Sequence, residues 1–181
     1  HRRSRNTQTF GHRPNKSIVS ATEMCDRIKA CVDTRDDDNF FIMARTDAYS
    51  NEGLERSIDR AVQYVEAGAN GIFAEAMASL EDYKQFCNAL DVPLLANMTE
   101  FGMTPLFTRE ALANQGTAII LYPLTALRAM NKAAENTYQH LLLKGDQQAL
   151  VNTMQTREEL YQYLDYHRYE NKIDKIKNKA R

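Results

Sequence analysis

From residue 17 onward, the chain alternates short apolar runs with longer segments that have the period of a helix. The apolar runs are NFFIMART (39–46), GIFAE (71–75), VPLLAN (92–97) and AIILYP (118–123). Segments of helical period occupy residues 20–32, 51–68, 80–90, 108–116 and 124–145. Strands that are apolar throughout and alternate with helices predict a parallel sheet covered by helices.

Three of these predicted strands end in a polar residue, namely Arg45, Glu75 and Asn97. In a β/α barrel, the site is built from the carboxyl ends of several strands and the loops that follow. A doubly wound sheet is less favoured, because no glycine-rich phosphate loop follows any of the strands. We therefore predict an α/β fold: the second half of a (β/α)8 barrel, with four parallel strands and their helices, followed by a helical carboxyl-terminal tail.

Composition excludes several classes of protein. The net charge is −1 and 43% of the residues are hydrophobic, which argues against a nucleic-acid or membrane partner for the chain as a whole. No apolar run approaches the length of a membrane span, and the first residues lack the apolar core of a signal peptide. These features predict a cytoplasmic protein. Its cysteines, Cys25, Cys31 and Cys87, are expected to be buried free thiols.

The strand ends leave two interpretations open for the charged residues. Arg45 and Asp47 form either a solvated ion pair or a clamp for a carboxylate ligand. Glu75 is either a carboxylate at the edge of the core or a group that orients a metal-bound water. Arg128 and Arg157 read as charges on helix surfaces, and no metal-ligand motif of usable spacing is present.

Several motifs together resemble the 2-methylisocitrate lyase family, within the isocitrate lyase and phosphoenolpyruvate mutase superfamily. They are GHRPNK, IMARTDA, GIFAEA, LLANMTEFGMTPLF, LYPLTALRAMNKAAENTY and NTMQTR, and the resemblance covers residues 11–181. It implies a β/α barrel whose last helices are exchanged within a homotetramer. The implied reaction is magnesium-dependent cleavage of a small tricarboxylate, 2-methylisocitrate, to pyruvate and succinate in propionate catabolism through the methylcitrate cycle.

The resemblance also assigns residues to the site. His12 matches the active-site histidine of the family. The implied substrate contacts are Gly11, Arg45, Glu75, Asn97, Met98, Thr99, Arg128 and Arg157. No metal ligand falls within this chain, because the aspartates that hold Mg2+ in the family lie upstream of the matching residues.

The first ten residues depart from the family pattern. The family's Lys-Arg-Cys, which ends in the acid that protonates the succinate carbanion, is replaced by Gln8, Thr9 and Phe10. One choice of codons for HRRSR, CAT CGA AGA TCA AGx, reads Ile-Glu-Asp-Gln as in the family when it is shifted by one nucleotide. We therefore interpret residues 1–10 as an out-of-frame segment, residues 11–145 as barrel strands five to eight, and residues 146–181 as a helical tail that makes oligomer contacts. The chain alone is then expected to be inactive.

Alternative functions remain open. Within the enzyme class, these are an isocitrate lyase or a phosphonate-forming mutase, because discriminating groups can lie upstream. From other classes, a non-catalytic interaction fragment would use the open sheet edge and the helical tail, and a nucleic-acid binder would depend on the basic first ten residues alone.

Overall fold

The computed structural model describes residues 17–179, and the chain divides into two compact units, His1–Leu127 and Arg128–Arg181. The elements of the first unit are α1 (Ala21–Thr34), β1 (Met43–Thr46), α2 (Tyr49–Glu52), α3 (Leu54–Glu66), β2 (Gly71–Ala74), α4 (Leu80–Ala89), β3 (Leu94–Asn97), α5 (Arg109–Ala113) and β4 (Ile119–Leu121). The second unit holds most of α6 (Thr125–Lys144) together with η1 (Gln148–Thr153), α7 (Arg157–Tyr163) and α8 (Tyr166–Lys179).

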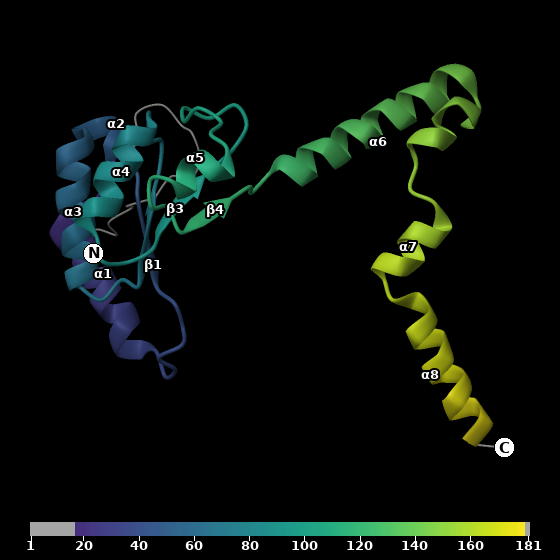
Figure 1. The fold of residues 1–181 in the computed structure, drawn as a ribbon, viewed down its shortest axis with the longest axis horizontal. Helices are drawn as coiled ribbons and strands as arrows, with labels where there is room; N and C mark the ends of the chain where they lie inside the picture. The colour runs from purple at the N-terminus through teal and green to yellow at the C-terminus, as the bar shows by residue number, and fades with distance from the viewer. Residues whose placement is uncertain (1–16, 180–181) are drawn as a thin grey trace, which may run out of the picture. The chain divides into compact units, whose positions relative to one another are not determined.

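The strands form one parallel sheet in the order β1-β2-β3-β4, as the sequence predicted (Figure 1). A row of residues runs across it in register: Arg45 pairs with Phe73, Phe73 with Leu95, and Leu95 with Ile119. Because all four strands run in the same direction, their carboxyl ends meet at one edge. The predicted polar strand ends are therefore brought to the same edge.

Local sequence signals explain where the helices start. Ser20, Ser79 and Thr108 cap α1, α4 and α5, and each side chain accepts a hydrogen bond from a backbone N–H of the first turn. The single helix predicted over residues 51–68 is interrupted instead, because Gly53 adopts a φ of 81° between α2 and α3. This left-handed conformation favours glycine and breaks the helical path.

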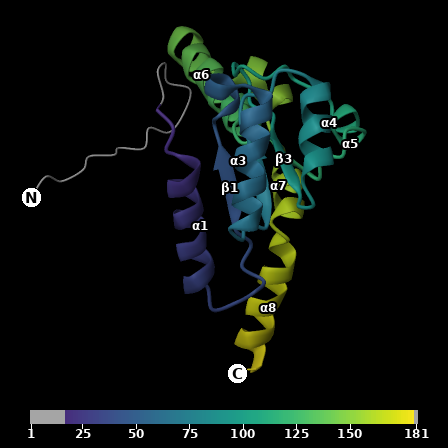
Figure 2. The ribbon, with the colours of Figure 1, turned by 90° about the vertical axis from the view of Figure 1, so that its left-hand side faces the viewer.

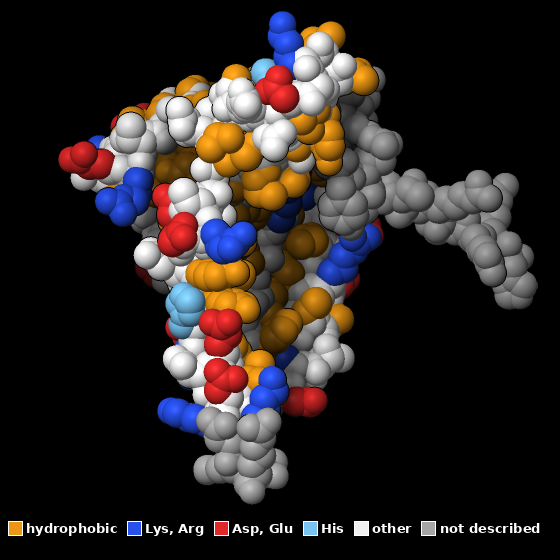
Figure 3. Space-filling view, turned by 90° about the vertical axis from the view of Figure 1, so that its right-hand side faces the viewer, with side chains coloured by type: hydrophobic (Ala, Val, Ile, Leu, Met, Phe, Trp, Pro, Cys, Tyr) orange, Lys and Arg blue, Asp and Glu red, His pale blue; other side chains and the backbone are white. Residues whose placement is uncertain are grey.

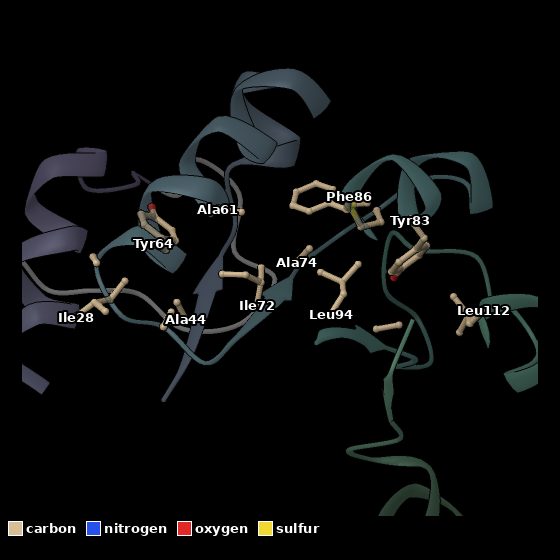
Figure 4. Packing of buried hydrophobic residues seen from close by; sticks show 14 of the residues in the cluster. Ile28, Ala44, Ala61, Tyr64, Ile72, Ala74, Tyr83, Phe86, Leu94 and Leu112 are labelled. Carbon is tan, nitrogen blue, oxygen red and sulfur yellow. The ribbon is translucent and has the colours of Figure 1, made fainter. Parts of the chain in front are cut away.

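The core of the first unit lies between the sheet and its helices. It includes Tyr64 of α3, Phe86 of α4, Ile72 of β2 and Leu94 of β3, all 3% exposed or less (Figure 4). Seen from the side in Figure 2, α1 and α3 lie in front of β1. Burial of each large apolar side chain contributes about 1.5–3 kcal/mol, so this layer stabilises the sheet.

The second unit has a different character. Within residues 128–177 no side chain is fully buried, and large apolar side chains are exposed, including Leu142 at 87% and Tyr163 at 83%. The space-filling view shows hydrophobic side chains gathered in patches at the surface, with charged side chains beside them (Figure 3). The predicted division at residues 145 and 146 stays a prediction.

Two expectations from composition can be compared with the described residues. None of the helices in residues 17–179 is both long enough and apolar enough to span a membrane. The prediction of buried thiols is wrong for Cys31, which is exposed at the end of α1, whereas Cys25 and Cys87 are partly buried. Cys31 lies on the outward side of α1, because the next residue, Val32, is the one in this turn that packs against the core.

Candidate functional site

Glu75, directly after β2, receives side chains from both neighbouring strands. Its Oε2 forms an ion pair with Arg45 Nη2 at 3.1 Å and accepts a hydrogen bond from Asn97 Nδ2 at 3.3 Å. Arg45 also donates from Nε and Nη2 to the two carboxylate oxygens of Asp47, at 2.8 and 2.9 Å. These four residues, Asp47, Arg45, Glu75 and Asn97, form a continuous chain of polar contacts that we call the strand-end row.

The strand-end row lies on the face of the sheet opposite the helices of the first unit. Successive side chains of a strand point to opposite faces. The helix-covered face is marked by the members of the hydrophobic core on the strands, which are Ala44, Ile72, Ala74, Leu94 and Ala96. Arg45, Phe73 and Asn97 alternate with these residues and therefore point to the other face. We call this face, which the helices of the first unit do not cover, the open face.

Arg45 is held on three sides. Its hydrogen bond to Asp47 raises the pKa of the guanidinium against the opposing effect of burial, and the charge of Glu75 acts in the same direction as Asp47. The Cζ atom lies 4.8 Å from the centre of the Phe73 ring, within the range of a cation–π contact. Arg45 is thus a fixed cation, 37% exposed, at the carboxyl edge of the sheet.

Asn97 presents a buried acceptor. Because the Glu75 carboxylate only accepts, the Nδ2 of Asn97 must face it, which fixes the orientation of the amide. The Oδ1 atom is then buried without a hydrogen-bond partner among the described residues. An unsatisfied buried acceptor costs about 1–3 kcal/mol. A ligand hydroxyl or a water molecule at this position would remove that cost.

The backbone is strained beside two carboxylates at this edge. Ala76, after Glu75, and Phe101, after Glu100, both have a φ of 62°, in the left-handed region. This conformation costs about 1–2 kcal/mol for a residue with a side chain. Such outliers cluster at functional sites, where the surrounding structure maintains them.

Sequence reasoning missed two aromatic residues near the row: Phe73, which contacts Arg45, and Tyr83 in the core. Phe73 lies two residues before Glu75, so the period of the strand places both on one face, and this signal was available. Tyr83 of α4 is fully buried and contacts Phe107 edge to face at 6.2 Å. Burial and, to a smaller extent, the Glu75 charge raise the pKa of Tyr83, so its hydroxyl stays neutral.

The remaining predicted site residues are placed as follows. Met98 is 2% exposed with its side chain in the core, and its amide donates to the Leu121 carbonyl at 2.8 Å, so it offers a ligand its carbonyl group. Thr99 is buried nearby at 8% exposure. Arg128 lies in α6 and Arg157 begins α7, both in the second unit. Gly11 and His12 lie outside the described residues, so their roles stay predictions.

The described residues do not fit a complete metal site. Within residues 17–179 no group of three His, Cys, Asp or Glu side chains is placed to hold an ion. Both carboxylates of the strand-end row, Asp47 and Glu75, are paired with Arg45. The expectation that the chain itself supplies no metal ligand set stays a prediction.

A parallel sheet with helices on one face and polar side chains at the carboxyl ends of its strands is typical of a β/α-barrel enzyme. Comparison with known families identifies which one. The chain belongs to the phosphoenolpyruvate phosphomutase family, whose model matches residues 6–142. The resemblance inferred from the motifs is confirmed at this level.

Two similar curated proteins are both named 2-methylisocitrate lyase. The one from Vibrio cholerae serotype O1 is 58% identical over 172 residues, and the one from Escherichia coli strain K12 is 55% identical over 166 residues. In each case 92% of this chain matches 56% of the relative. The chain therefore spans about half the length of these relatives.

A solved structure supports the fold independently. Oxaloacetate acetylhydrolase in complex with the inhibitor 3,3-difluorooxalacetate superposes with a TM-score of 0.79 at 29% sequence identity. The match covers 93% of this chain and 58% of that one. The predicted α/β architecture with four parallel strands, about half of such a chain, is confirmed.

Proposed function

We propose that this chain forms part of a carbon–carbon lyase that cleaves 2-methylisocitrate to pyruvate and succinate. The observation that carries the proposal is the strand-end row, in which Arg45, Glu75 and Asn97 from three consecutive strands converge on the open face. Relatives at 55–58% identity that carry the name of this activity support the choice of substrate.

The row offers complementary groups to a hydroxylated carboxylate. Asp47 uses one N–H on Nε and one on Nη2 of Arg45, and Glu75 forms an ion pair with Nη2, which leaves the two N–H groups on Nη1 for a ligand carboxylate. The buried Oδ1 of Asn97 can accept a hydrogen bond from a ligand hydroxyl. Fixed groups of this kind orient the bond that breaks, which lowers the barrier by proximity and alignment.

The proposed reaction breaks the bond between the hydroxyl-bearing carbon and its neighbour. The hydroxyl proton passes to a base, the C–O bond becomes the ketone of pyruvate, and the electron pair stays on the succinate carbon. That carbon then takes a proton from an acid. Phe10 stands where the family has a cysteine acid, so residues 17–179 are assigned binding and orientation, and the proton donor lies outside them.

Further cations are needed for a tricarboxylate. The strand-end row holds one guanidinium and two carboxylates, a net charge of −1, so on its own it repels an anion. Arg128 and Arg157 are the family's candidates for this role. Magnesium would act as an electrophile in the family's chemistry, but the described residues hold no set of ligands for it, and we assign it none here.

The second unit is proposed to associate with other copies, in a tetramer as in the resemblance. Helix α6 has 20 residues, none of them buried in the described structure, although Leu141, Leu142 and Leu143 are adjacent in its last turn. A helix in water gains most of its stability from packing an apolar face. Light scattering during size-exclusion chromatography measures the molar mass of the assembly and would test the tetramer. The mass of a monomer at micromolar concentration would contradict it.

The experiment for the reaction uses a defined protein. In the composite enzyme, residues 11–181 follow the part of the Vibrio cholerae relative that precedes its match to Gly11, so the composite includes the Lys-Arg-Cys expected from the family pattern. We expect it to release pyruvate from 2-methylisocitrate, and Arg45→Ala to lower kcat/KM by at least about 100-fold, since a charged anchor for a carboxylate is lost. The matched control is Arg27→Ala, a change in a partly exposed arginine on α1 that pairs with Glu23.

Two results would reject this function. Pyruvate release that is unchanged in Arg45→Ala would show that the strand-end row does not bind the substrate. Cleavage of isocitrate to glyoxylate, with no reaction of 2-methylisocitrate, would favour the isocitrate lyase alternative.

A further inference from the structure

The feature that carries a further inference is Asp47, which has no assigned role although both its carboxylate oxygens bind Arg45. Residues i and i+2 of an extended segment point to the same face. Asp47 therefore lies on the open face together with Arg45 and contacts its Nε and Nη2 at 2.8 and 2.9 Å. A bidentate pair of this geometry fixes the plane of a guanidinium as well as its position.

A turn holds Asp47 in place. Thr46 is 5% exposed, and its Oγ1 accepts a hydrogen bond from the backbone N–H of Ala48 at 3.2 Å. Ala48 is itself buried at 1% exposure, and the Thr46 carbonyl accepts from the backbone N–H of Glu75 at 3.0 Å. The backbone on both sides of Asp47 is thus fixed, so the carboxylate is a rigid support.

The geometry points to Asp47 as a positioning residue that turns Arg45 so that only its Nη1 faces the ligand. Asp47 occupies the edge formed by Nε and Nη2, and the Glu75 carboxylate forms an ion pair with Nη2 at 3.1 Å. Among the described residues, Nη1 has no hydrogen-bond partner. A substrate carboxylate then binds end-on through Nη1, whereas an unrestrained arginine would offer its Nε–Nη2 edge.

The molecule contains a matched control for this inference. Arg60 of α3 forms a similar bidentate pair with Glu52 of α2, with both contacts at 2.6 Å. That pair lies among the helices, where Arg60 Nη1 also donates to the Val19 carbonyl at 2.9 Å. Glu52→Gln removes one carboxylate from an arginine just as Asp47→Asn does, but away from the strand-end row.

The first measurement does not depend on activity. In the composite enzyme, phenylglyoxal labels arginines, and mass spectrometry gives the rate at each one. We expect Asp47→Asn to raise the rate at Arg45 at least about threefold without changing Arg60, and Glu52→Gln to do the reverse, because a paired guanidinium is shielded. Equal labelling of Arg45 with and without Asp47 would overturn the inference.

The second measurement rests on the proposed function. With 2-methylisocitrate, Asp47→Asn should raise KM about tenfold and Arg45→Ala about 100-fold, and the double variant should match Arg45→Ala alone, because Asp47 acts only through Arg45. Multiplying effects would overturn the positioning role. A composite enzyme that never turns over would reject the proposed function only, while the labelling result would still decide the role of Asp47.

Discussion

Arg45 shares its charge between two carboxylates, and this arrangement predicts a stability effect that is larger than the sum of its parts. Asp47→Asn or Glu75→Gln alone leaves the guanidinium with one carboxylate. A hydrogen bond to a charged group contributes about 1.5–3 kcal/mol. Because the Arg45 side chain is 37% exposed, solvent reduces this contribution, and we expect each single change to cost about 1 kcal/mol.

The double change removes both carboxylates at once. Breaking a buried ion pair and leaving one charge unpartnered costs about 3–5 kcal/mol. With partial exposure of Arg45 we expect about 3 kcal/mol, which exceeds the sum of the single changes by about 1 kcal/mol. Glu75 is the more buried partner, with 6% of its side chain exposed, so Glu75→Gln should have the larger effect of the two single changes.

Urea denaturation of the composite enzyme and of its three variants, followed by circular dichroism, measures this coupling. Glu52→Gln combined with Glu75→Gln serves as the additive control, because the two carboxylates bind different arginines. If the effects of Asp47→Asn and Glu75→Gln on the free energy of unfolding add to within about 0.3–0.5 kcal/mol, the two carboxylates do not share Arg45, and the coupling expected within the strand-end row is refuted.

Three further predictions concern the first unit. Gly53→Ala should cost about 1 kcal/mol in urea denaturation, because φ is 81° although the added methyl group meets no atom within 4 Å; no loss would refute the backbone argument. Iodoacetamide should label Cys31 faster than Cys87, because burial raises the pKa of the Cys87 thiol; equal rates in peptide mass spectrometry would refute this. Arg60 lowers the pKa of Glu52, so its stabilising effect should be complete above the ordinary carboxyl pKa and be lost as the pH falls through the lowered value; a Glu52→Gln variant with the same acid sensitivity as the parent would refute it.

Much of the sheet could be predicted from local patterns. The apolar runs gave the strands and their parallel order, and polar strand ends gave the convergence of Arg45, Glu75 and Asn97. The break at Gly53 was missed, because the predicted helix over residues 51–68 was based on apolar residues that all follow Gly53, and only the structure reveals the left-handed φ of this glycine.

The contacts within the row were harder to predict. The sequence left the Arg45–Asp47 pair as either a solvated pair or an anion clamp, and the structure shows a guanidinium that is bound along one edge and open at Nη1. The strand period places Phe73 on the face of Glu75, but its contact with Arg45 depends on the register of β1 and β2. The burial of Tyr83 depends on the packing of α4. Register and helix packing are tertiary properties that no local pattern encodes.

The lack of fully buried side chains in residues 128–177 has a thermodynamic consequence. If the apolar side chains of this unit find their partners on other molecules, its order is linked to association, and the free energy of folding acquires a term in protein concentration. The helical signal of this unit would then melt at a higher temperature as the protein concentration rises. The sheet and the helices packed on it would gain much less from the same increase.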